Sequence, residues 1–341
     1  MWFGEAARAR FAGAVEPGTH VLIDARVAEL HEATIAPLLS ATSVQLIDAT
    51  EDQKSMERMP VFMSRLLEAR VRRGHRLLAV GGGIVQDIVC FIAATLLRGI
   101  EWRFIPTTLL AQADSCIGSK SSINVGKTKN AVGTYTPPGE ICVWPDFLDT
   151  LDGRDVRSGI GEMLKVHAID GPESFSRIAG DYELLTTDRA VLLEYIRRSL
   201  GIKRELIELD EFDRGLRNVL NYGHSFGHAI ESATGFAIPH GIAITIGMDM
   251  ANFVAACLGT ASRGPFERMH PTLQRNFAGY ERREIPLGRL LDALGTDKKN
   301  TDAGLRVVLP DAHGRIHVVD QRPDERFMTA CAEYLATGRL A

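Results

Sequence analysis

Short apolar runs alternate with segments of helical periodicity through the first 150 residues, and this alternation constrains the fold more than any other feature of the chain. Helical spacing fills the intervals between the runs, as in Met56–Val71. The strand-like runs, several of them rich in β-branched residues, are His20–Asp24, Ser43–Asp48, Arg76–Val80 and Glu101–Ile105. Strands that alternate with helices of this length are typical of a parallel sheet covered by helices. We therefore predict an α/β domain for this half.

The second half has a different texture, with long amphipathic segments in place of the alternation. These segments are Arg154–Ile169, Arg189–Leu209, Leu216–Ala233, Gly241–Leu258 and Leu287–Leu294. The late stretch Leu305–Val319 has the pattern of a hairpin around a turn. A chain of 341 residues is long enough for two ordinary domains. We predict an α/β domain over 1–148 and a mainly helical domain over 149–341.

Composition excludes several classes of protein. The chain is 45% hydrophobic and 24% charged, with a formal net charge of -4, which argues against a nucleic-acid-binding role. No run approaches about 18 uninterrupted apolar residues, so we expect no membrane-spanning helix and no contact with a membrane. The N-terminus lacks the apolar core of a signal peptide. The cysteines form no CxxC pair, which is typical of reduced thiols in a cytoplasmic protein; they are Cys90, Cys116, Cys142, Cys257 and Cys331.

A glycine triplet, Gly81–Gly83, follows one predicted strand and begins a predicted helix. Glycine at such a turn lets the main chain approach a pyrophosphate, and the helix N-terminus favours anionic oxygen. A plain tight turn explains the triplet equally well, because it is not the GxGxxG fingerprint. Asp87, in the first turn of that helix, would either bond a cofactor or complement the helix dipole.

Three of the ten histidines fall between positions 224 and 240. His224 and His228 are four residues apart and share one face of a predicted helix, and His240 follows in a turn. Two imidazoles and one carboxylate, with positions left open, form a ligand set of catalytic zinc, and Glu162 on another predicted helix is a candidate carboxylate. The spacing does not decide between His224 and His228, and a structural or surface role explains any one histidine alone.

Polar and basic residues gather in otherwise apolar surroundings. They include Thr107, Thr108, Asp114, Lys120, Asn124, Lys127, Lys129 and Asn130, and later Lys203, Arg204, Arg217, Asn221, Asp297, Lys298 and Lys299. Lysine is a point-charge ligand for phosphate, and arginine binds carboxylate bidentately. A solvated surface explains any single lysine. Together the residues indicate a nucleotide and an anionic substrate, leave a metal open, and specify no reaction.

Several segments in a fixed order carry a resemblance to a known family. They are GGGIVQDIVCFIAATLLRG, IPTTLLAQADSCIGSKSSIN, KN, GEMLK, GLRNVLNYGHSFGHAIE, HG and DKK. In order and spacing they resemble the dehydroquinate synthase family of sugar-phosphate cyclases over residues 80–310. The resemblance implies an N-terminal Rossmann-like domain that binds NAD⁺. It also implies a mainly helical C-terminal domain that carries a divalent metal, usually Zn²⁺, with Co²⁺ as a substitute.

The resemblance implies roles for individual residues. It makes Glu162, His224 and His240 the metal ligands. The cofactor contacts would be Glu51, Lys54, Gly81, Gly82, Gly83, Asp87, Thr107, Thr108, Lys129 and Thr150. The phosphate pocket would be Lys120, Asn130, Asn221, His228 and one lysine of the pair Lys298 and Lys299. Lys203 and Arg217 would hold a substrate carboxylate, Asp114 would lie near the reacting hydroxyls, and Lys165 beside a metal ligand. Arg98 matches an arginine that the family donates across a homodimer interface.

The implied reaction of the shikimate pathway turns 3-deoxy-D-arabino-heptulosonate 7-phosphate into 3-dehydroquinate and phosphate, through transient NAD⁺ oxidation, phosphate elimination and aldol closure. Some pocket positions depart from the common family sequence, including Ser119, Ser122, Tyr222 and the segment 125–128. These departures leave open a cyclase of specialised metabolism that acts on an amino analogue, sedoheptulose 7-phosphate or glucose 6-phosphate. The two sugar phosphates lack the carboxylate that Lys203 and Arg217 would hold. A metal-dependent polyol dehydrogenase and a non-catalytic paralogue are the remaining alternatives.

Overall fold

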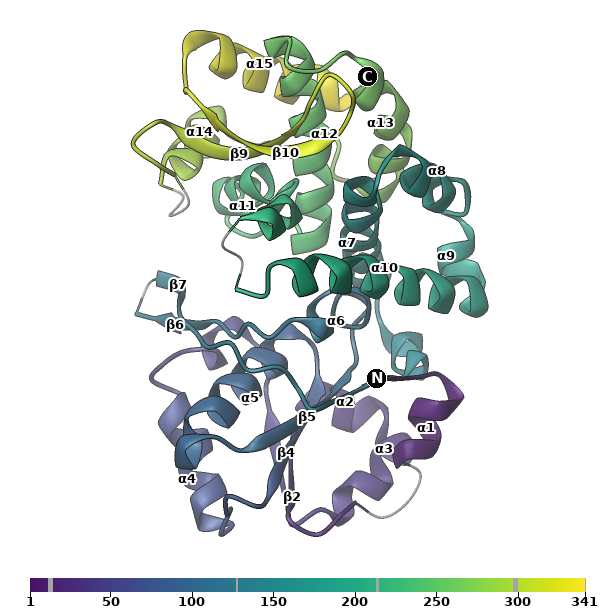
Figure 1. Ribbon diagram of the computed structural model, residues 1–341, viewed down its shortest axis with the longest axis vertical. Coiled ribbons are helices and arrows are strands. Elements are labelled where there is room, and N and C mark those ends of the chain that lie inside the picture. Colours follow the sequence, from purple (N-terminus) through teal and green to yellow (C-terminus); the bar gives the residue numbers. More distant parts are fainter. Residues whose placement is uncertain (12–14, 127, 213–214, 297–299, 341) are drawn as a thin grey trace. The chain divides into compact units, whose positions relative to one another are not determined.

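The computed structural model describes residues 1–11, 15–126, 128–212, 215–296 and 300–340. The chain forms two compact units, Met1–Asp152 (unit 1) and Gly153–Ala341 (unit 2). In Figure 1 unit 1 runs from purple to blue-teal, and unit 2 continues through green to yellow.

Unit 1 is built on a six-stranded sheet in the order β1-β8-β5-β4-β2-β3, in which every pair is parallel. The strands are β1 (Trp2–Phe3), β2 (Thr19–Asp24), β3 (Ser43–Ile47), β4 (Arg76–Gly81), β5 (Glu101–Pro106) and β8 (Glu140–Val143). The central strands β2 and β4 are buried over almost their whole length, because helices cover both faces of a parallel sheet. The predicted α/β class is confirmed.

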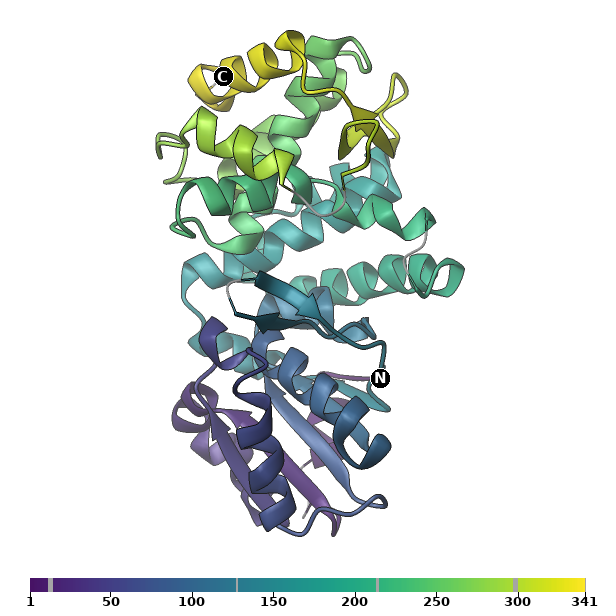
Figure 2. The ribbon, with the colours of Figure 1, turned by 90° about the vertical axis from the view of Figure 1, so that its left-hand side faces the viewer.

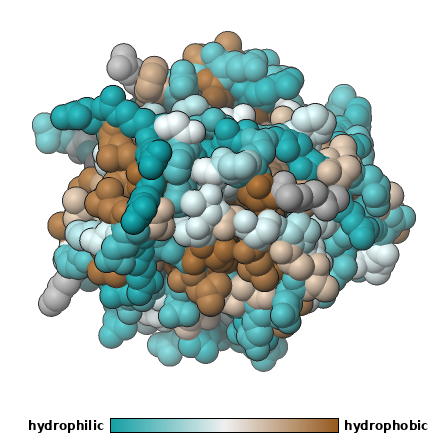
Figure 3. All heavy atoms as spheres, turned by 90° about the horizontal axis from the view of Figure 1, so that it is seen from below, coloured by the Kyte–Doolittle hydropathy of each residue, from teal (hydrophilic) through white to brown (hydrophobic). Residues whose placement is uncertain are grey.

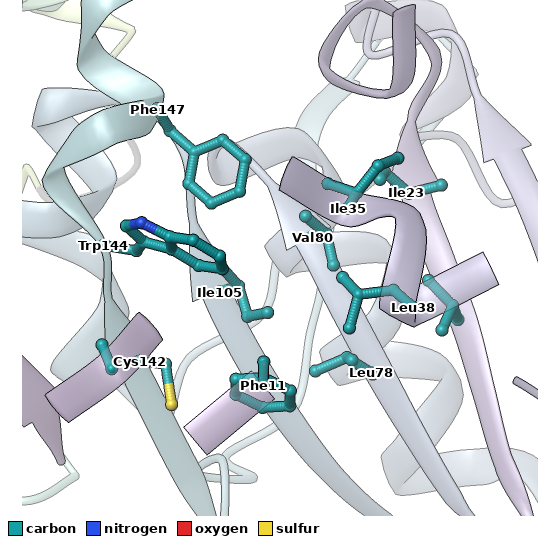
Figure 4. Packing of buried hydrophobic residues seen from close by; sticks show 12 residues of the cluster. Phe11, Ile23, Ile35, Leu38, Leu78, Val80, Ile105, Cys142, Trp144 and Phe147 are labelled. Carbon is teal, nitrogen blue, oxygen red and sulfur yellow. The ribbon is translucent and has the colours of Figure 1, made fainter. Parts of the chain in front are cut away.

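The helices of unit 1 flank this sheet on both sides (Figure 2). They are α1 (Glu5–Phe11), α2 (Ala25–Leu30), α3 (Glu32–Ile35), α4 (Met59–Glu68), α5 (Gly83–Thr95) and α6 (Leu109–Ala113), with 3-10 turns at Ala36–Ser40, Glu51–Gln53, Leu96–Arg98, Ser115–Ile117 and Pro145–Thr150. Figure 4 shows the core on one face, where Phe11, Ile35 and Leu38 meet alternate residues of β2 and β4. The other face receives α5, which places the glycine triplet at the end of β4.

A short antiparallel hairpin, β6 (Ile123–Val125) and β7 (Thr128–Val132), stands apart from the main sheet. An isolated bridge joins its residue Asn124 to Ser55, so the hairpin is attached to the segment that follows β3. Residues far apart in the sequence are thereby brought beside α5.

The surface of unit 1 carries scattered apolar side chains, among them Leu46 on the edge strand β3 at 57% exposure. On the face drawn in Figure 3, brown apolar patches are separated by polar residues. Scattered exposed apolar side chains are normal on protein surfaces and do not by themselves mark a partner.

Unit 2 is mainly helical, as predicted. Its helices are α7 (Gly153–Asp170), α8 (Pro172–Gly180), α9 (Leu184–Thr187), α10 (Arg189–Leu209), α11 (His224–Ala233), α12 (His240–Leu258), α13 (Gly264–Asn276), α14 (Leu287–Gly295) and α15 (Glu325–Ala336), with 3-10 turns at Leu216–Asn221 and Gly338–Leu340. A hairpin of β9 (Leu305–Pro310) and β10 (Ile316–Gln321) forms where the sequence predicts one. The predicted helix Leu216–Ala233 is wrong as one element, because Gly223 takes a left-handed conformation (φ 75°) and α11 begins after it.

Helix α12 forms the centre of unit 2 and contacts α7, α11, α13 and α15 around it (Figure 1). It is long and apolar enough to span a membrane by composition, with a mean hydropathy of 1.6, yet 83% of that window is buried inside the unit. Its apolar surface is therefore the core against which the other helices are fixed. His240 is its first residue.

Candidate functional site

Three polar side chains converge where α7, α11 and α12 cross in unit 2. Glu162 comes from the middle of α7, and His224 and His240 are the first residues of α11 and α12. The Oε1 atom of Glu162 lies 3.7 Å from His224 Nε2 and 3.4 Å from His240 Nε2. The structure thus brings together the three residues that the family resemblance gave as metal ligands.

Glycines beside these residues make the crossing possible. A Cβ atom on Gly161 would lie 2.3 Å from the carbonyl oxygen of Gly241, and one on Gly223 would lie 2.6 Å from that of Ile244. No real side chain fits at such distances, so these glycines let the helix backbones touch. The contacts place Glu162 and His224 opposite the start of α12.

The other ring nitrogen of each histidine is also engaged. His224 Nδ1 lies 3.3 Å from the carbonyl oxygen of Tyr222, and His240 Nδ1 lies 3.2 and 3.3 Å from the two carboxylate oxygens of Glu231. Both Nε2 atoms are therefore directed to Glu162. The sequence analysis missed Glu231, although its position seven residues after His224 puts it on the same face of α11.

The ionisable groups at this centre shift one another's pKa values. Burial raises the pKa of Glu162, but Lys165, whose Nζ is 2.5 Å from Oε2, and the imidazoles outweigh it and hold the pKa well below its usual value. Burial and Lys165 lower the pKa of His224 well below normal. Burial also lowers the pKa of His240, but Glu162 and Glu231 raise it to about 10. The two carboxylates that raise the pKa of His240 also favour a divalent cation, which would take the place of the proton.

The spacing of the three side chains fits such a cation. Tetrahedral zinc with ligands at about 2.1 Å places neighbouring ligand atoms about 3.4 Å apart, close to the two separations from Glu162 Oε1. A second set is available, since ligand atoms of His224, His228 and His240 lie within 4.8 Å of one another. Both sets share His224 and His240. Imidazole and carboxylate donors suit Zn²⁺ or Co²⁺.

The other sequence-predicted residues of unit 2 lie on the surrounding elements. The ring of His228 is 5.2 Å from that of His224 and 5.6 Å from that of His240. Lys203 on α10 and Arg217 on the following 3-10 turn are both buried, and Arg217 Nη1 donates to the Glu211 carbonyl at 2.8 Å. Asn221 Nδ2 donates to the Asn218 carbonyl. Lys298 and its neighbour Lys299 lie outside the described residues.

The three glycines of the triplet in unit 1 have different surroundings. A Cβ atom on Gly81 would lie 2.6 Å from Val85 Cγ2, and one on Gly82 would lie 3.0 Å from Thr108 Cγ2, whereas one on Gly83 would meet nothing within 4 Å. Packing explains the first two glycines and leaves the third without a structural reason. Gly83 begins α5, where helix amides are available to an anion, so this turn fits the pyrophosphate of a dinucleotide.

Four residues assigned by resemblance meet beside α5. Lys54 Nζ lies 3.1 Å from Asp87 Oδ2 and 2.9 Å from Asn130 Oδ1, and Glu51 Oε1 accepts a hydrogen bond from Asn124 at 2.8 Å. The amide and hydroxyl of Ser122 both donate to Asp87 at 2.9 Å. Burial raises the pKa of Asp87, although Lys54 and Ser122 act against this. These contacts fasten the hairpin and the 51–54 turn to α5.

The remaining candidates of unit 1 occupy several places. The Thr107 amide donates to Gly81, and Thr108 caps α6, so both threonines lie against the glycine turn. Thr150 Oγ1 is 2.7 Å from His31 Nε2, and Lys120 Nζ lies 5.9 Å from the centre of the Tyr135 ring. Asp114 ends α6, Lys129 is exposed on β7, and Arg98 is exposed with a left-handed backbone (φ 67°).

Comparison with known proteins gives consistent matches over most of the chain. The family model described as 3-dehydroquinate synthase N-terminal matches residues 44–158, and the one described as 3-dehydroquinate synthase C-terminal matches residues 159–300. The 3-dehydroquinate synthase of Thermoanaerobacter sp. (strain X514) is 35% identical over 285 residues, which cover 83% of this chain and 80% of the relative. That of Enterococcus faecalis (strain ATCC 47077 / OG1RF) is 34% identical over 313 residues, covering 89% and 86%.

Solved structures are similar over nearly all of the chain. A 2-epi-5-epi-valiolone synthase from Streptomyces hygroscopicus subsp. jinggangensis 5008, with NAD⁺ and Zn²⁺ bound, has a TM-score of 0.82 and 28% identity, covering 94% of this chain and 91% of that one. A 2-deoxy-scyllo-inosose synthase with carbaglucose-6-phosphate, NAD⁺ and Co²⁺ has a TM-score of 0.85 at 21% identity, covering 98% and 95%, and is similar in fold alone.

Proposed function

Because the chain belongs to the 3-dehydroquinate synthase family of NAD- and metal-dependent sugar-phosphate cyclases, we propose that it converts 3-deoxy-D-arabino-heptulosonate 7-phosphate to 3-dehydroquinate and phosphate. The observation that carries this proposal is the convergence of Glu162, His224 and His240 at separations that suit a divalent cation. The matched synthases, at 34–35% identity, favour this member of the superfamily.

Two bound groups supply chemistry that side chains lack: a divalent cation lowers the pKa of a substrate hydroxyl, and NAD⁺ accepts a hydride and later returns it. Glu162, His224 and His240 would hold the cation, and Lys165 keeps Glu162 ionised. The glycine turn of unit 1 would bind the pyrophosphate, with Thr107 and Thr108 against it. Glu51, Lys54, Asp87, Lys129 and Thr150 are the further cofactor contacts proposed.

The substrate's two anionic groups would be bound separately. We assign the carboxylate to Lys203 and Arg217, since a buried lysine and a buried arginine suit an anionic ligand. The phosphate is assigned to Lys120, Asn130, Asn221, His228 and Lys298, and Asp114 to the reacting hydroxyls. The departing phosphate can take up the neighbouring proton itself, so no separate protein base is required.

Assembly and location are part of the same proposal. Arg98 stands exposed at a turn where Leu97 and Arg98 both have left-handed backbones, φ 52° and 67°, which cost energy outside glycine. A homodimer in which Arg98 reaches the partner's substrate gives that strained turn a function. All five cysteines are free thiols, which supports action in the cytoplasm.

A cyclase of specialised metabolism is the second candidate. The likeness to a 2-epi-5-epi-valiolone synthase favours it, as do the departures at Ser119 and Ser122 from the common family sequence. Sedoheptulose 7-phosphate and glucose 6-phosphate would then replace the carboxylated substrate, whereas an amino analogue would keep the carboxylate.

Phosphate release distinguishes these candidates. Purified protein with NAD⁺ and Zn²⁺ or Co²⁺ is mixed separately with the three sugar phosphates, and products are identified by mass. We expect release from 3-deoxy-D-arabino-heptulosonate 7-phosphate alone, with no NADH accumulating. Release from only one of the other two would retain the cyclase mechanism and refute the substrate. Lasting NADH without phosphate would indicate a polyol dehydrogenase.

A further inference from the structure

The two histidines that face Glu162 are held in place by different kinds of acceptor. His224 Nδ1 lies against a main-chain oxygen, that of Tyr222, which no side-chain substitution removes. Tyr222 is itself fixed, because its buried hydroxyl donates to Asn252 at 2.5 Å. His240 Nδ1 instead lies against a side-chain carboxylate, that of Glu231. The orientation of His240 therefore depends on one residue.

Glu231 is well placed to hold that ring. Its two carboxylate oxygens are 3.3 and 3.2 Å from His240 Nδ1, and its side chain is 13% exposed. Helix α11 fixes its position, since His224, His228 and Glu231 follow the spacing i, i+4 and i+7 along one face. The glutamate thus lies on the same face of α11 as the two histidines.

The contact determines which nitrogen of His240 is free. An imidazole whose Nδ1–H donates to a carboxylate keeps its Nε2 lone pair for a metal, and the carboxylate raises its basicity as a ligand. Here that lone pair is directed to Glu162, 3.4 Å away. Without Glu231 the ring could turn over, and the alternative set of His224, His228 and His240 would compete.

We propose that Glu231 is a positioning residue that fixes the His240 ring and thereby selects the set Glu162, His224 and His240 for a divalent cation over the three-histidine set. The inference rests on the proposed function for the assignment of these ligands. It assigns Glu231 no contact with the substrate.

Co²⁺ binding tests the inference without any substrate. The full-length protein and its variants E231A, E231Q, E162Q and E267Q are freed of metal and titrated with Co²⁺ against a competing chelator, and the visible spectrum of each complex is recorded. We expect E231A to weaken Co²⁺ binding about ten- to a hundredfold and to change the spectrum. E231Q, which keeps an acceptor oxygen without the charge, should fall between E231A and wild type. The exposed glutamate of α13 makes E267Q the matched control, with unchanged affinity.

Several outcomes would overturn the inference. A folded E231A with the affinity and spectrum of wild type removes the role of Glu231, and if E231A fails to fold, E231Q with wild-type binding does the same. Wild-type Co²⁺ affinity in E162Q would show that the ligand set is wrong. If instead the protein acts on none of the three sugar phosphates while E231A and E162Q both weaken Co²⁺ binding, the proposed reaction fails and the inference stands.

Discussion

Each unit contains a carboxylate in contact with a lysine, half-buried in unit 1 and fully buried in unit 2, and the two pairs differ in what else touches the carboxylate. In unit 1, Asp87 meets Lys54 and also receives the amide and hydroxyl of Ser122. In unit 2, Glu162 meets Lys165 and faces the Nε2 atoms of His224 and His240. The first carboxylate accepts hydrogen bonds from lysine and serine donors, whereas the second faces imidazole nitrogens, which are donors that suit a divalent metal.

The pKa directions follow the same division. Burial dominates at Asp87 and raises its pKa, whereas at Glu162 Lys165 and the histidines outweigh burial and lower it. A carboxylate whose charge is already compensated by hydrogen bonds has a structural use, here joining three segments of unit 1. A carboxylate that stays ionised beside two imidazoles offers donor atoms that a divalent cation binds. In unit 1 the carboxylate–lysine pair thus joins chain segments beside the proposed cofactor site, and in unit 2 it supports the proposed cation site.

Replacing each of the two carboxylates by its isosteric amide, in E162Q and D87N, should give the largest difference between the units. We expect E162Q to lose bound metal and to lower activity by on the order of 10³-fold or more, because a metal's charge stabilisation is worth several kcal/mol. D87N should keep its metal and instead destabilise unit 1 by about 2 kcal/mol, since the buried Lys54 loses the charge of its nearest carboxylate. Metal content by elemental analysis and urea unfolding measure both effects. A D87N protein that lost its metal would contradict the division.

Acid should lower the stability of unit 2 through the fully buried His167. Burial, followed by Arg198, lowers the pKa of His167 from 6.5 to about 4, and its Nδ1 is 2.8 Å from Ser174 Oγ. The folded state therefore favours the neutral ring, so this stability is complete above pH 6.5 and is lost as the pH falls towards 4. The loss should reach about 3 kcal/mol.

The variant H167Q carries no such proton and should flatten this dependence. Urea unfolding of both proteins between pH 7 and pH 4, followed by a probe in unit 2, measures the difference. Equal slopes in the two proteins would refute a linkage through His167.

The two proposed ligands should each slow hydrogen exchange in a different unit. At about 100 times the dissociation constant, a ligand stabilises its binding region by about 2.7 kcal/mol. Zn²⁺ should slow hydrogen exchange in α7 and at the starts of α11 and α12, and NAD⁺ should slow it at the start of α5. Protection of α5 by Zn²⁺ alone would argue against separate sites in the two units.

The smallest effect is expected at the glycine turn. G83A should fold normally, because a Cβ there meets nothing within 4 Å, and should weaken NAD⁺ binding about tenfold by obstructing the pyrophosphate. G81A is the structural counterpart, since its Cβ would lie 2.6 Å from Val85 and should lower stability. Calorimetric titration with NAD⁺ and thermal unfolding compare the two. An unchanged NAD⁺ affinity in G83A would favour a plain turn.

Sequence reasoning anticipated the class of each unit because the pattern of burial there is periodic. Alternating runs predicted the parallel sheet, and the pattern of Leu305–Val319 predicted the hairpin of β9 and β10. It failed at Leu216–Ala233, where an apolar pattern continues through a turn. Periodicity reports which residues are buried, and it contains nothing about the left-handed backbone of Gly223.

Single residues of the site show the same limit. Spacing left His224 and His228 as equal candidates, and only the contact of His224 with Glu162 distinguishes their surroundings. Glu231 was missed because its partner His240 starts another helix. The sequence left Asp87 either as a cofactor contact or as a complement to the helix dipole. Its hydrogen-bond donors in the structure come from residues 54 and 122, which no local pattern relates to it.

The sequence by itself determined two domains of different class and the chemical types of the site residues, because hydrophobic spacing and side-chain chemistry are local properties. The tertiary structure alone decided which atoms meet: that both Nε2 atoms face Glu162, that Glu231 contacts His240, and that Ser122 donates to Asp87. The reason is physical. Backbone contacts at Gly161 and Gly223 bring residues more than sixty positions apart to within 3.4 and 3.7 Å of one another, and no local pattern specifies which helices will touch.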